Sequence, residues 1–114
     1  MANLLTQRCL SHSFADVCRL VRYQLPLLNK SLIDHVITGV LVKDDDECQL
    51  RCYMEPRCLS YNLGPHMPYG HECEISNSDH VQHAQDLVSR PGYTYIGTEV
   101  QNSSCKLSCF QALN

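Results

Sequence analysis

The middle of the chain begins with a pattern that predicts a strand followed by a helix. β-Branched residues dominate positions 33–42, and a glycine within this run predicts a bend or bulge in the strand. In the charged run that follows, Asp44 precedes Glu47 with the spacing of a capping pair at a helix N-terminus. We therefore expect a short helix through residues 48–54 that ends before Pro56.

The pattern after the helix predicts a β-hairpin with a long tip and one further strand. Apolar and polar residues alternate over positions 58–63, and residues 73–76 form a second short strand pattern. Glycine and proline bracket the segment 64–71 between them, which predicts a turn-rich loop. A turn at residues 91–92 then leads into the last predicted strand, residues 93–96.

The two ends of the chain carry little pattern. We expect residues 1–23 to form a poorly structured lead-in, within which residues 15–21 have the spacing of a helical turn or two. Residues 98–114 are predicted as a C-terminal tail, whose two cysteines fit the start of a truncated cysteine-rich module.

Composition and charge limit the classes of function. The chain has 114 residues, of which 44% are hydrophobic, and this size is typical of one compact domain. The net charge of −3, with only nine Lys and Arg residues, disfavours nucleic acid as a partner, because phosphate binding needs clustered positive charge. The apolar runs are too short to span a bilayer, so we expect no direct membrane insertion.

Eight cysteines are the most informative feature of the composition. Short secreted chains use cysteines as disulfide staples because their cores are small, and an even number suits complete pairing. Two N-glycosylation sequons, at Asn29 and Asn102, also favour a secreted, extracellular glycoprotein. The N-terminus has no features of a secretory signal, so we expect a piece of a longer secreted or membrane-anchored protein, or a sequence that lacks its true start.

Four of the cysteines lie within the predicted helix and hairpin. Cys48 and Cys52 are four positions apart and therefore share one helix face. Cys58 and Cys73 lie at the starts of the two predicted hairpin strands. The pairing that avoids crossing nests one loop within the other, joining Cys52 to Cys58 and Cys48 to Cys73. In the chain-entropy treatment of disulfides, the outer loop stabilises the fold by about 3 kcal/mol.

These motifs occur in an order that resembles one known family. The run at residues 32–37, the Cys-x3-Cys helix, the Cys-Leu-Ser-Tyr-Asn strand at 58–62, the Cys-Glu-Ile strand at 73–75 and the closing strand at 91–95 look like a PAN/Apple domain. The resemblance covers residues 24–97. It implies an α+β fold in which a curved antiparallel β-sheet cradles one short α-helix. It also implies the same two disulfides as staples.

The resemblance leaves four cysteines unassigned: Cys9 and Cys18 before the domain, and Cys105 and Cys109 after it. Apple domains add a third disulfide that joins the two ends of the domain, whereas plain PAN modules lack it. These four cysteines allow three pairings, and the sequence does not choose among them.

A small intracellular zinc-binding protein that uses the same cysteines is the alternative. The histidines at 66, 71, 80 and 83 could in principle complete such a site, but the paired short spacings of zinc knuckles and ribbons are absent. We therefore expect no metal site and no cofactor.

No catalytic site is predicted either. Ser60, His71 and Asp79 are the residue types of a hydrolytic triad, but no glycines flank Ser60 as in a nucleophile elbow, and Ser60 falls in a predicted strand. A glycine-rich phosphate loop is also absent from the sequence. We expect the protein not to be an enzyme.

The resemblance implies a non-catalytic recognition or adhesion module, which binds an extracellular protein or carbohydrate (glycan) ligand as part of a larger multidomain protein. The candidate contact surface is the loop 64–72, with His66, Met67, Tyr69 and His71. An exposed aromatic ring and a soft apolar side chain on a stapled hairpin resemble a recognition tip. The alternative is a surface loop without a binding role.

Heparin-like chains are a disfavoured ligand. Their binding would need a basic patch, because sulfates are recognised by clustered positive charge. Arg51, Arg57 and Arg90 are instead scattered through an acidic chain.

Overall fold

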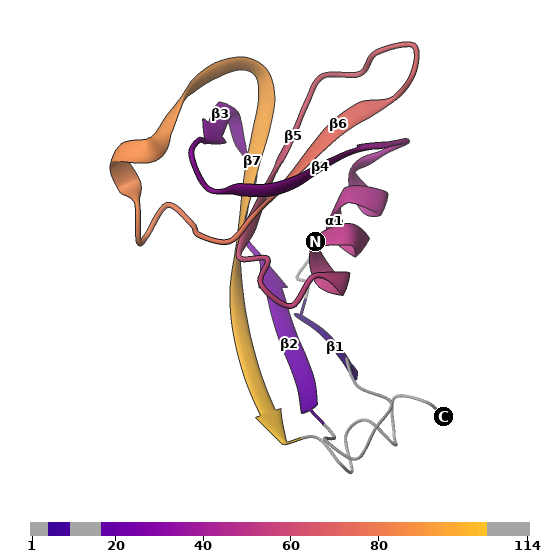
Figure 1. Cartoon of the computed structure of the whole chain (residues 1–114), viewed down its shortest axis with the longest axis vertical. Helices are drawn as coiled ribbons and strands as arrows, with labels where there is room; N and C mark the ends of the chain where they lie inside the picture. Colours follow the sequence, from indigo (N-terminus) through magenta and orange to yellow (C-terminus); the bar gives the residue numbers. More distant parts are fainter. Residues whose placement is uncertain (1–4, 10–16, 105–114) are drawn as a thin grey trace. The chain divides into compact units, whose positions relative to one another are not determined.

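The structure, a computed structural model, describes residues 5–9 and 17–104. These residues form two compact units (Figure 1), of which one comprises Gln24–Gly97 and the other the described residues before and after that range. Strand β7, Leu87–Ser104, contributes its first part to one unit and its last part to the other. The Gln24–Gly97 unit contains the helix and both described disulfides.

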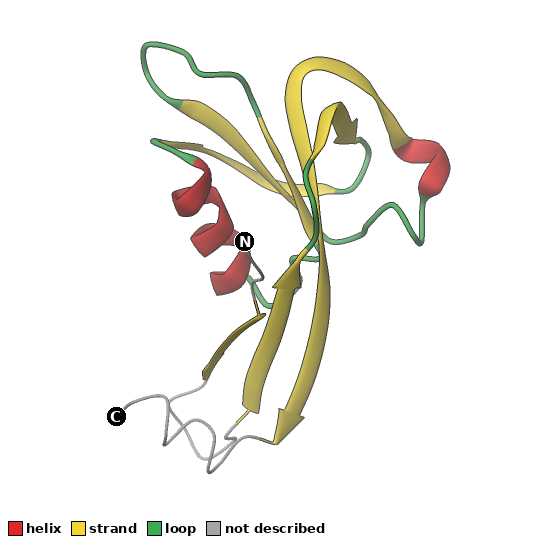
Figure 2. Cartoon of the chain, turned by 180° about the vertical axis from the view of Figure 1, so that it is seen from behind, coloured by secondary structure: helices red, strands yellow, loops and turns green. Residues whose placement is uncertain are grey.

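An antiparallel sheet forms the frame of the Gln24–Gly97 unit. Its elements before β7 are β3 Leu27–Leu32, β4 Val36–Val42, α1 Asp45–Met54, β5 Ser60–Leu63, β6 His71–Ser76 and the 3-10 turn Ala84–Asp86. The strands lie in the order β3-β7-β5-β6-β4, and each neighbouring pair is antiparallel. The sheet is curled, and α1 packs against β4, β5 and β6 (Figure 2). The predicted α+β fold class is therefore confirmed.

Helix α1 begins where the capping pair was predicted. Asp44 is the N-cap, and its Oδ1 accepts a hydrogen bond from the Glu47 backbone N–H at 2.9 Å. Glu47 Oε1 accepts in turn from the Lys43 N–H at 2.8 Å. The predicted cap is therefore confirmed: the helix starts at Asp45, its acidic residues form the first turn, and it ends at Met54 as expected. Within the described residues, no helix is long and apolar enough to cross a membrane.

The predicted hairpin is present as β5 and β6. Its register pairs Ser60 with Ser76 and Leu63 with Cys73. On its other side β5 pairs with β7, so β5 is an interior strand. The last strand begins at Leu87, earlier than the predicted residues 93–96, because its first residues pair with β3.

Large buried side chains from the sheet strands make up the core of this unit. Tyr61, Tyr95, Leu32 and Ile75 are all buried. The Tyr61 hydroxyl donates a hydrogen bond to Asp45 Oδ1 at 2.8 Å, which joins the interior strand β5 to the first turn of α1. The same side chain therefore fills the core and positions the helix.

The buried amide of Asn62 attaches β3 to β5. Its Oδ1 accepts from the Leu32 backbone N–H at 2.9 Å, and its Nδ2 donates to the Leu32 carbonyl at 2.9 Å. Nδ2 also donates to Glu74 Oε1 at 3.0 Å. The Asn62 side chain thus bonds the N–H and the carbonyl of one β3 residue, as the backbone of a neighbouring strand would. The backbone strand partner of β3 at this position is β7.

The other unit corrects the expectation for the start of the chain. Strands β1, Leu5–Cys9, and β2, Val17–Tyr23, pair antiparallel, and β2 pairs with the last part of β7. The expected poorly structured lead-in therefore contains two strands, and the expected helical turn at 15–21 is wrong where the structure describes it. Of the two strands that pair with β2, β7 lies some eighty residues further along the chain. Local periodicity carries no information about such a distant partner. Residues 98–104 of the predicted tail belong to β7, and the rest of the tail lies outside the described residues.

Candidate binding surface

The tip of the β5–β6 hairpin is a tight turn held by backbone hydrogen bonds. Met67 N–H donates to the Gly70 carbonyl at 3.0 Å, and Gly70 N–H donates to the Met67 carbonyl at 2.9 Å. Gly70 has a φ of 116°, and a Cβ atom at this position would lie 2.6 Å from the Val42 carbonyl oxygen. Only glycine fits both conditions, so Gly70 allows the sequence Met-Pro-Tyr-Gly to form this tight turn.

The two histidines that flank this turn face each other. His66 Nδ1 lies 3.4 Å from His71 Nε2. His71 Nδ1 lies 2.7 Å from the Gly64 carbonyl oxygen. The base of the tip is closed by a hydrogen bond from Gly64 N–H to the Glu72 carbonyl at 2.7 Å.

Apolar surface is exposed at the same tip. The side chain of Tyr69 is 65% exposed and that of Met67 39% exposed. The hairpin turn therefore brings together all four residues that the sequence analysis named as a candidate contact surface.

A polar network that the sequence analysis missed adjoins this tip. The Tyr93 hydroxyl donates to Glu72 Oε1 at 2.9 Å, and the Tyr93 ring lies close to Gly64. The Arg90 guanidinium lies 3.6 Å from the centroid of the Tyr93 ring and 3.1 Å from Glu74 Oε1. Burial and the hydrogen bond to Glu72 raise the pKa of Tyr93 above its usual value. The one sequence signal for this network is that Glu72 and Glu74 are two positions apart on a strand, so both lie on the same face of the sheet.

Three arginines that could contact a heparin-like ligand, Arg51, Arg57 and Arg90, are each paired with a carboxylate. Arg90 pairs with Glu74, as described above. Arg51 lies 3.8 Å from Glu47, and Arg57 lies 2.9 Å from Glu55. Pairing reduces the positive potential that each guanidinium offers to an anion, so these residues do not form a basic patch.

Two disulfides tie helix α1 to the hairpin, one to β6 and one to the residues just before β5. Cys48 is joined to Cys73 and Cys52 to Cys58, with Cα–Cα distances of 5.6 and 5.3 Å. All four residues are buried. The nested pairing expected from the sequence is therefore present, and Cys73 fixes β6 two residues beyond His71.

The zinc alternative is overturned by these disulfides. A cysteine binds zinc as a thiolate, and the four sulfurs that the alternative required are instead bonded in pairs. Among the residues that the structure describes, no group of three or more His, Cys, Asp or Glu side chains is arranged to hold a metal ion.

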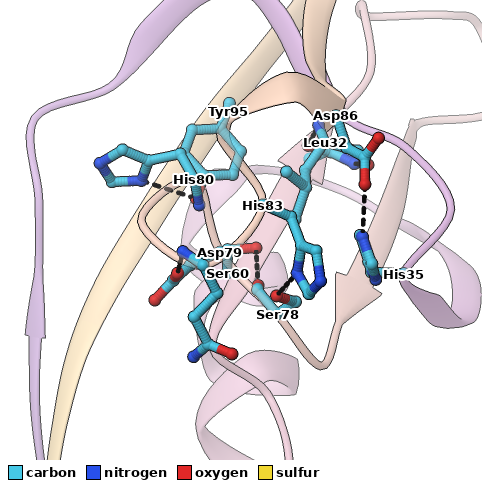
Figure 3. Close-up of polar contacts among 11 residues, drawn as sticks. Leu32, His35, Ser60, Ser78, Asp79, His80, His83, Asp86 and Tyr95 are labelled. Atoms are coloured by element: carbon cyan, nitrogen blue, oxygen red, sulfur yellow. Dashed lines mark hydrogen bonds and ion pairs between the residues drawn. The ribbon is translucent and has the colours of Figure 1, made fainter.

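The remaining described histidines dock the loop between β6 and β7 onto the sheet (Figure 3). His80 donates its backbone N–H to the Tyr95 hydroxyl at 2.9 Å, and its Nδ1 lies 3.0 Å from the same oxygen. His83 Nδ1 lies 2.6 Å from Ser78 Oγ, and its ring stacks on His35 with centroids 4.1 Å apart. These rings have structural partners within the protein, which explains their positions without a ligand.

Ser60, His71 and Asp79, the residue types of a hydrolytic triad, do not come together in the structure. The Ser60 hydroxyl is buried and donates to the Ser78 carbonyl at 2.7 Å, so its hydrogen is already used. The hairpin register places Ser60 opposite Ser76, whereas His71 lies at the other end of β6, beside the tip. Asp79 instead accepts backbone hydrogen bonds from its own loop.

The other residues singled out from the sequence fall in different parts of the chain. The register of β1 and β2 places Cys9 opposite Cys18, whereas Cys105 and Cys109 lie outside the described residues. Asn29 is exposed at a bulge of β3, where its Oδ1 accepts from the Gly92 N–H at 3.0 Å. Asn102, the second sequon, lies in β7.

A curled antiparallel sheet with one helix, tied by two nested disulfides, defines a small stapled α+β module. A family model described as the PAN domain matches residues 27–111, which is most of the chain. The protein therefore belongs to the PAN domain family, and the resemblance given by its motifs is confirmed. PAN domains are in general non-catalytic modules that bind protein or carbohydrate. No significant match joins the chain to a curated protein or to a solved structure.

Proposed function

We propose that this chain is an extracellular recognition module whose hairpin tip, residues 64–72, contacts a protein or glycan ligand. The observation that carries the proposal is the exposure of Tyr69 and Met67 on a turn whose base is tied to α1 by a disulfide. Family membership supports the general activity, and the geometry of the tip supports the location.

The physical argument for the tip rests on preorganisation. A binding loop that orders only on contact loses conformational entropy, and this loss reduces its affinity. The hydrogen bonds between Met67 and Gly70 and the disulfide at Cys73 already hold this turn in the free protein. A tyrosine on such a turn offers a large apolar face and a hydroxyl, the combination found in the residues that dominate binding energies.

The charge of the chain narrows the class of ligand. The chain has a net charge of −3, and Arg51, Arg57 and Arg90 are each paired with a carboxylate, so these three arginines offer no clustered positive charge to a sulfated chain. The proposed ligand is therefore a protein surface or a glycan of low charge, contacted through the ring of Tyr69.

Disulfides and sequons support a location outside the cell. Structural disulfides persist in oxidising compartments, and buried ones such as these stabilise small secreted domains. At Asn29 the hydrogen bond to Gly92 uses the side-chain oxygen, so a glycan on the nitrogen is compatible with the fold. We propose a secreted protein or ectodomain, glycosylated at Asn29 and Asn102, in which this module is one non-catalytic part of a larger multidomain protein.

Alanine variants of the tip test the proposed surface. The wild-type chain would be applied to arrays of extracellular proteins and of glycans, and its strongest ligand would then be titrated with each variant. We expect Tyr69→Ala to reduce the affinity at least about thirtyfold, the equivalent of about 2 kcal/mol for a dominant contact. Met67→Ala should have a smaller effect in the same direction.

Met54→Ala is the matched control, because Met54 is 64% exposed at the end of α1, away from the hairpin turn. Its affinity should equal that of the wild type. Comparing Tyr69→Phe with Tyr69→Ala separates the contribution of the hydroxyl to the affinity from that of the aromatic ring. If Tyr69→Ala and Met67→Ala both bind as tightly as the wild type, the tip is not the binding surface.

A further inference from the structure

The two histidines of the tip have ring nitrogens at the separation of a metal chelate. Their facing nitrogens, Nδ1 of His66 and Nε2 of His71, lie 3.4 Å apart. Zinc–imidazole bonds are about 2.0–2.1 Å long, so two ligands at a tetrahedral angle lie about 3.3–3.4 Å apart. The nitrogens of the free protein are therefore already at the separation that a tetrahedral ion requires.

The hydrogen bonds around His71 put its lone pair on the correct nitrogen. The Gly64 carbonyl can only accept, so the proton of the neutral His71 ring lies on Nδ1, which donates to it at 2.7 Å. Nε2 then carries the lone pair and faces His66. A histidine whose other nitrogen donates to a carbonyl is the usual arrangement of a metal ligand, because that contact fixes both the tautomer and the ring orientation.

We propose that His66 and His71 form a two-histidine site for a divalent transition-metal ion of the zinc type. On binding, the proton on His66 Nδ1, which points at His71 in the free protein, is released or moves to Nε2. His66 Nδ1 and His71 Nε2 then coordinate the ion. Two protein ligands leave two tetrahedral positions for water or for a donor atom of a partner.

The tip is rigid enough to keep this separation. Pro65 and Pro68 restrict the backbone on both sides of Met67. The Gly64 N–H is held by the Glu72 carbonyl, which also positions the carbonyl oxygen that orients His71. Holding both rings near the coordinating geometry before the ion arrives lowers the entropy lost on binding.

This site is distinct from the zinc alternative that the disulfides exclude, because it uses no sulfur. It also does not depend on the proposed recognition function, since it can be measured with the metal ion alone. If both hold, the ion occupies the same hairpin tip as Tyr69.

Calorimetric titration of Zn²⁺ into the intact, oxidised chain without a histidine tag tests the site. We expect one saturable event with one ion per chain, accompanied by NMR shifts of the His66 and His71 rings. Cu²⁺ should bind more tightly than Zn²⁺, and Mg²⁺ should not compete, because it prefers oxygen ligands. His66→Asn and His71→Asn should each weaken Zn²⁺ binding at least tenfold.

His80→Asn is the control, because His80 contacts Tyr95 outside the tip, and its affinity for Zn²⁺ should stay within twofold of the wild type. Thermal unfolding without metal checks that each variant folds, and the exposed His66 gives the decisive variant if the His71 variant does not. The proposal is overturned if His66→Asn binds Zn²⁺ like the wild type, if the shifts occur at other histidines, or if no saturable binding occurs at millimolar Zn²⁺.

Discussion

A single buried amide shows how much one residue decides in this fold. Asn62 lies in an interior strand where an apolar residue would be the usual occupant, and its amide satisfies the backbone of Leu32 at both the N–H and the carbonyl. Its third hydrogen bond, to Glu74, links the same amide to the network of Arg90 and Tyr93 beside the tip. The residue therefore connects β3 to the surface proposed to bind a ligand.

Replacing this amide tests its contribution. We expect Asn62→Ala to lower the free energy of unfolding by about 1–3 kcal/mol, because the Leu32 N–H loses its acceptor in a buried position. Urea denaturation under non-reducing conditions measures the change. Asn77→Ala is the control, since Asn77 is exposed, and its effect should stay within about 0.5 kcal/mol. Equal stability of the two variants would contradict the role given to Asn62.

The histidines show that residues of one type can have different roles in this fold. His66 and His71 meet at the tip, whereas His35, His80 and His83 hold the loop between β6 and β7 against its neighbours. The sequence places His66 and His71 on one loop, but the contacts that each ring makes depend on the folded structure.

At the scale of elements, the helix and the hairpin are joined by two sulfur bridges of different loop length. Cys48–Cys73 closes a loop of 25 residues, and Cys52–Cys58 closes one of 6. A disulfide that closes a longer loop removes more entropy from the unfolded chain. The outer bridge also reaches β6 near the tip, so it supports the proposed binding surface more directly than the inner bridge does.

Removing each bridge separately tests this ranking. The double variant Cys48→Ala/Cys73→Ala should lose about 3 kcal/mol of stability by the loop-entropy relation, and Cys52→Ala/Cys58→Ala about 2 kcal/mol. The pairs are matched controls for each other because all four residues are fully buried. Chemical denaturation of the two variants gives the comparison. A larger loss for the inner pair would show that packing, rather than loop length, dominates.

At the scale of the whole molecule, the chain divides into two compact units. The Gln24–Gly97 unit contains α1, the buried tyrosines and both described disulfides. The other unit consists, where it is described, of β1, β2 and the end of β7. We propose that residues 24–97 are the autonomous folding domain and that the flanking segments depend on them.

A fragment of residues 24–97 provides the test. We expect it to form both disulfides, to unfold cooperatively and to keep slow hydrogen exchange in β5, whose strand lies between β6 and β7. Exchange rates in the fragment and in the full chain would be compared residue by residue. Loss of protection throughout β5 in the fragment would contradict an autonomous domain with these boundaries.

The sequence by itself was sufficient for the features that depend on near neighbours. The capping of α1 by Asp44 and Glu47, the β5–β6 hairpin and the nested pairing of four cysteines all follow from spacings that local geometry makes informative. It was not sufficient for the pairing of β2 with β7 or for the hydrogen bonds between Asn62 and Leu32, because these partners are distant in sequence. The facing rings of His66 and His71 also needed the tertiary structure. A strand pairing, a buried hydrogen bond and a separation of 3.4 Å between two nitrogens all depend on how distant segments are brought together, which only the folded chain decides.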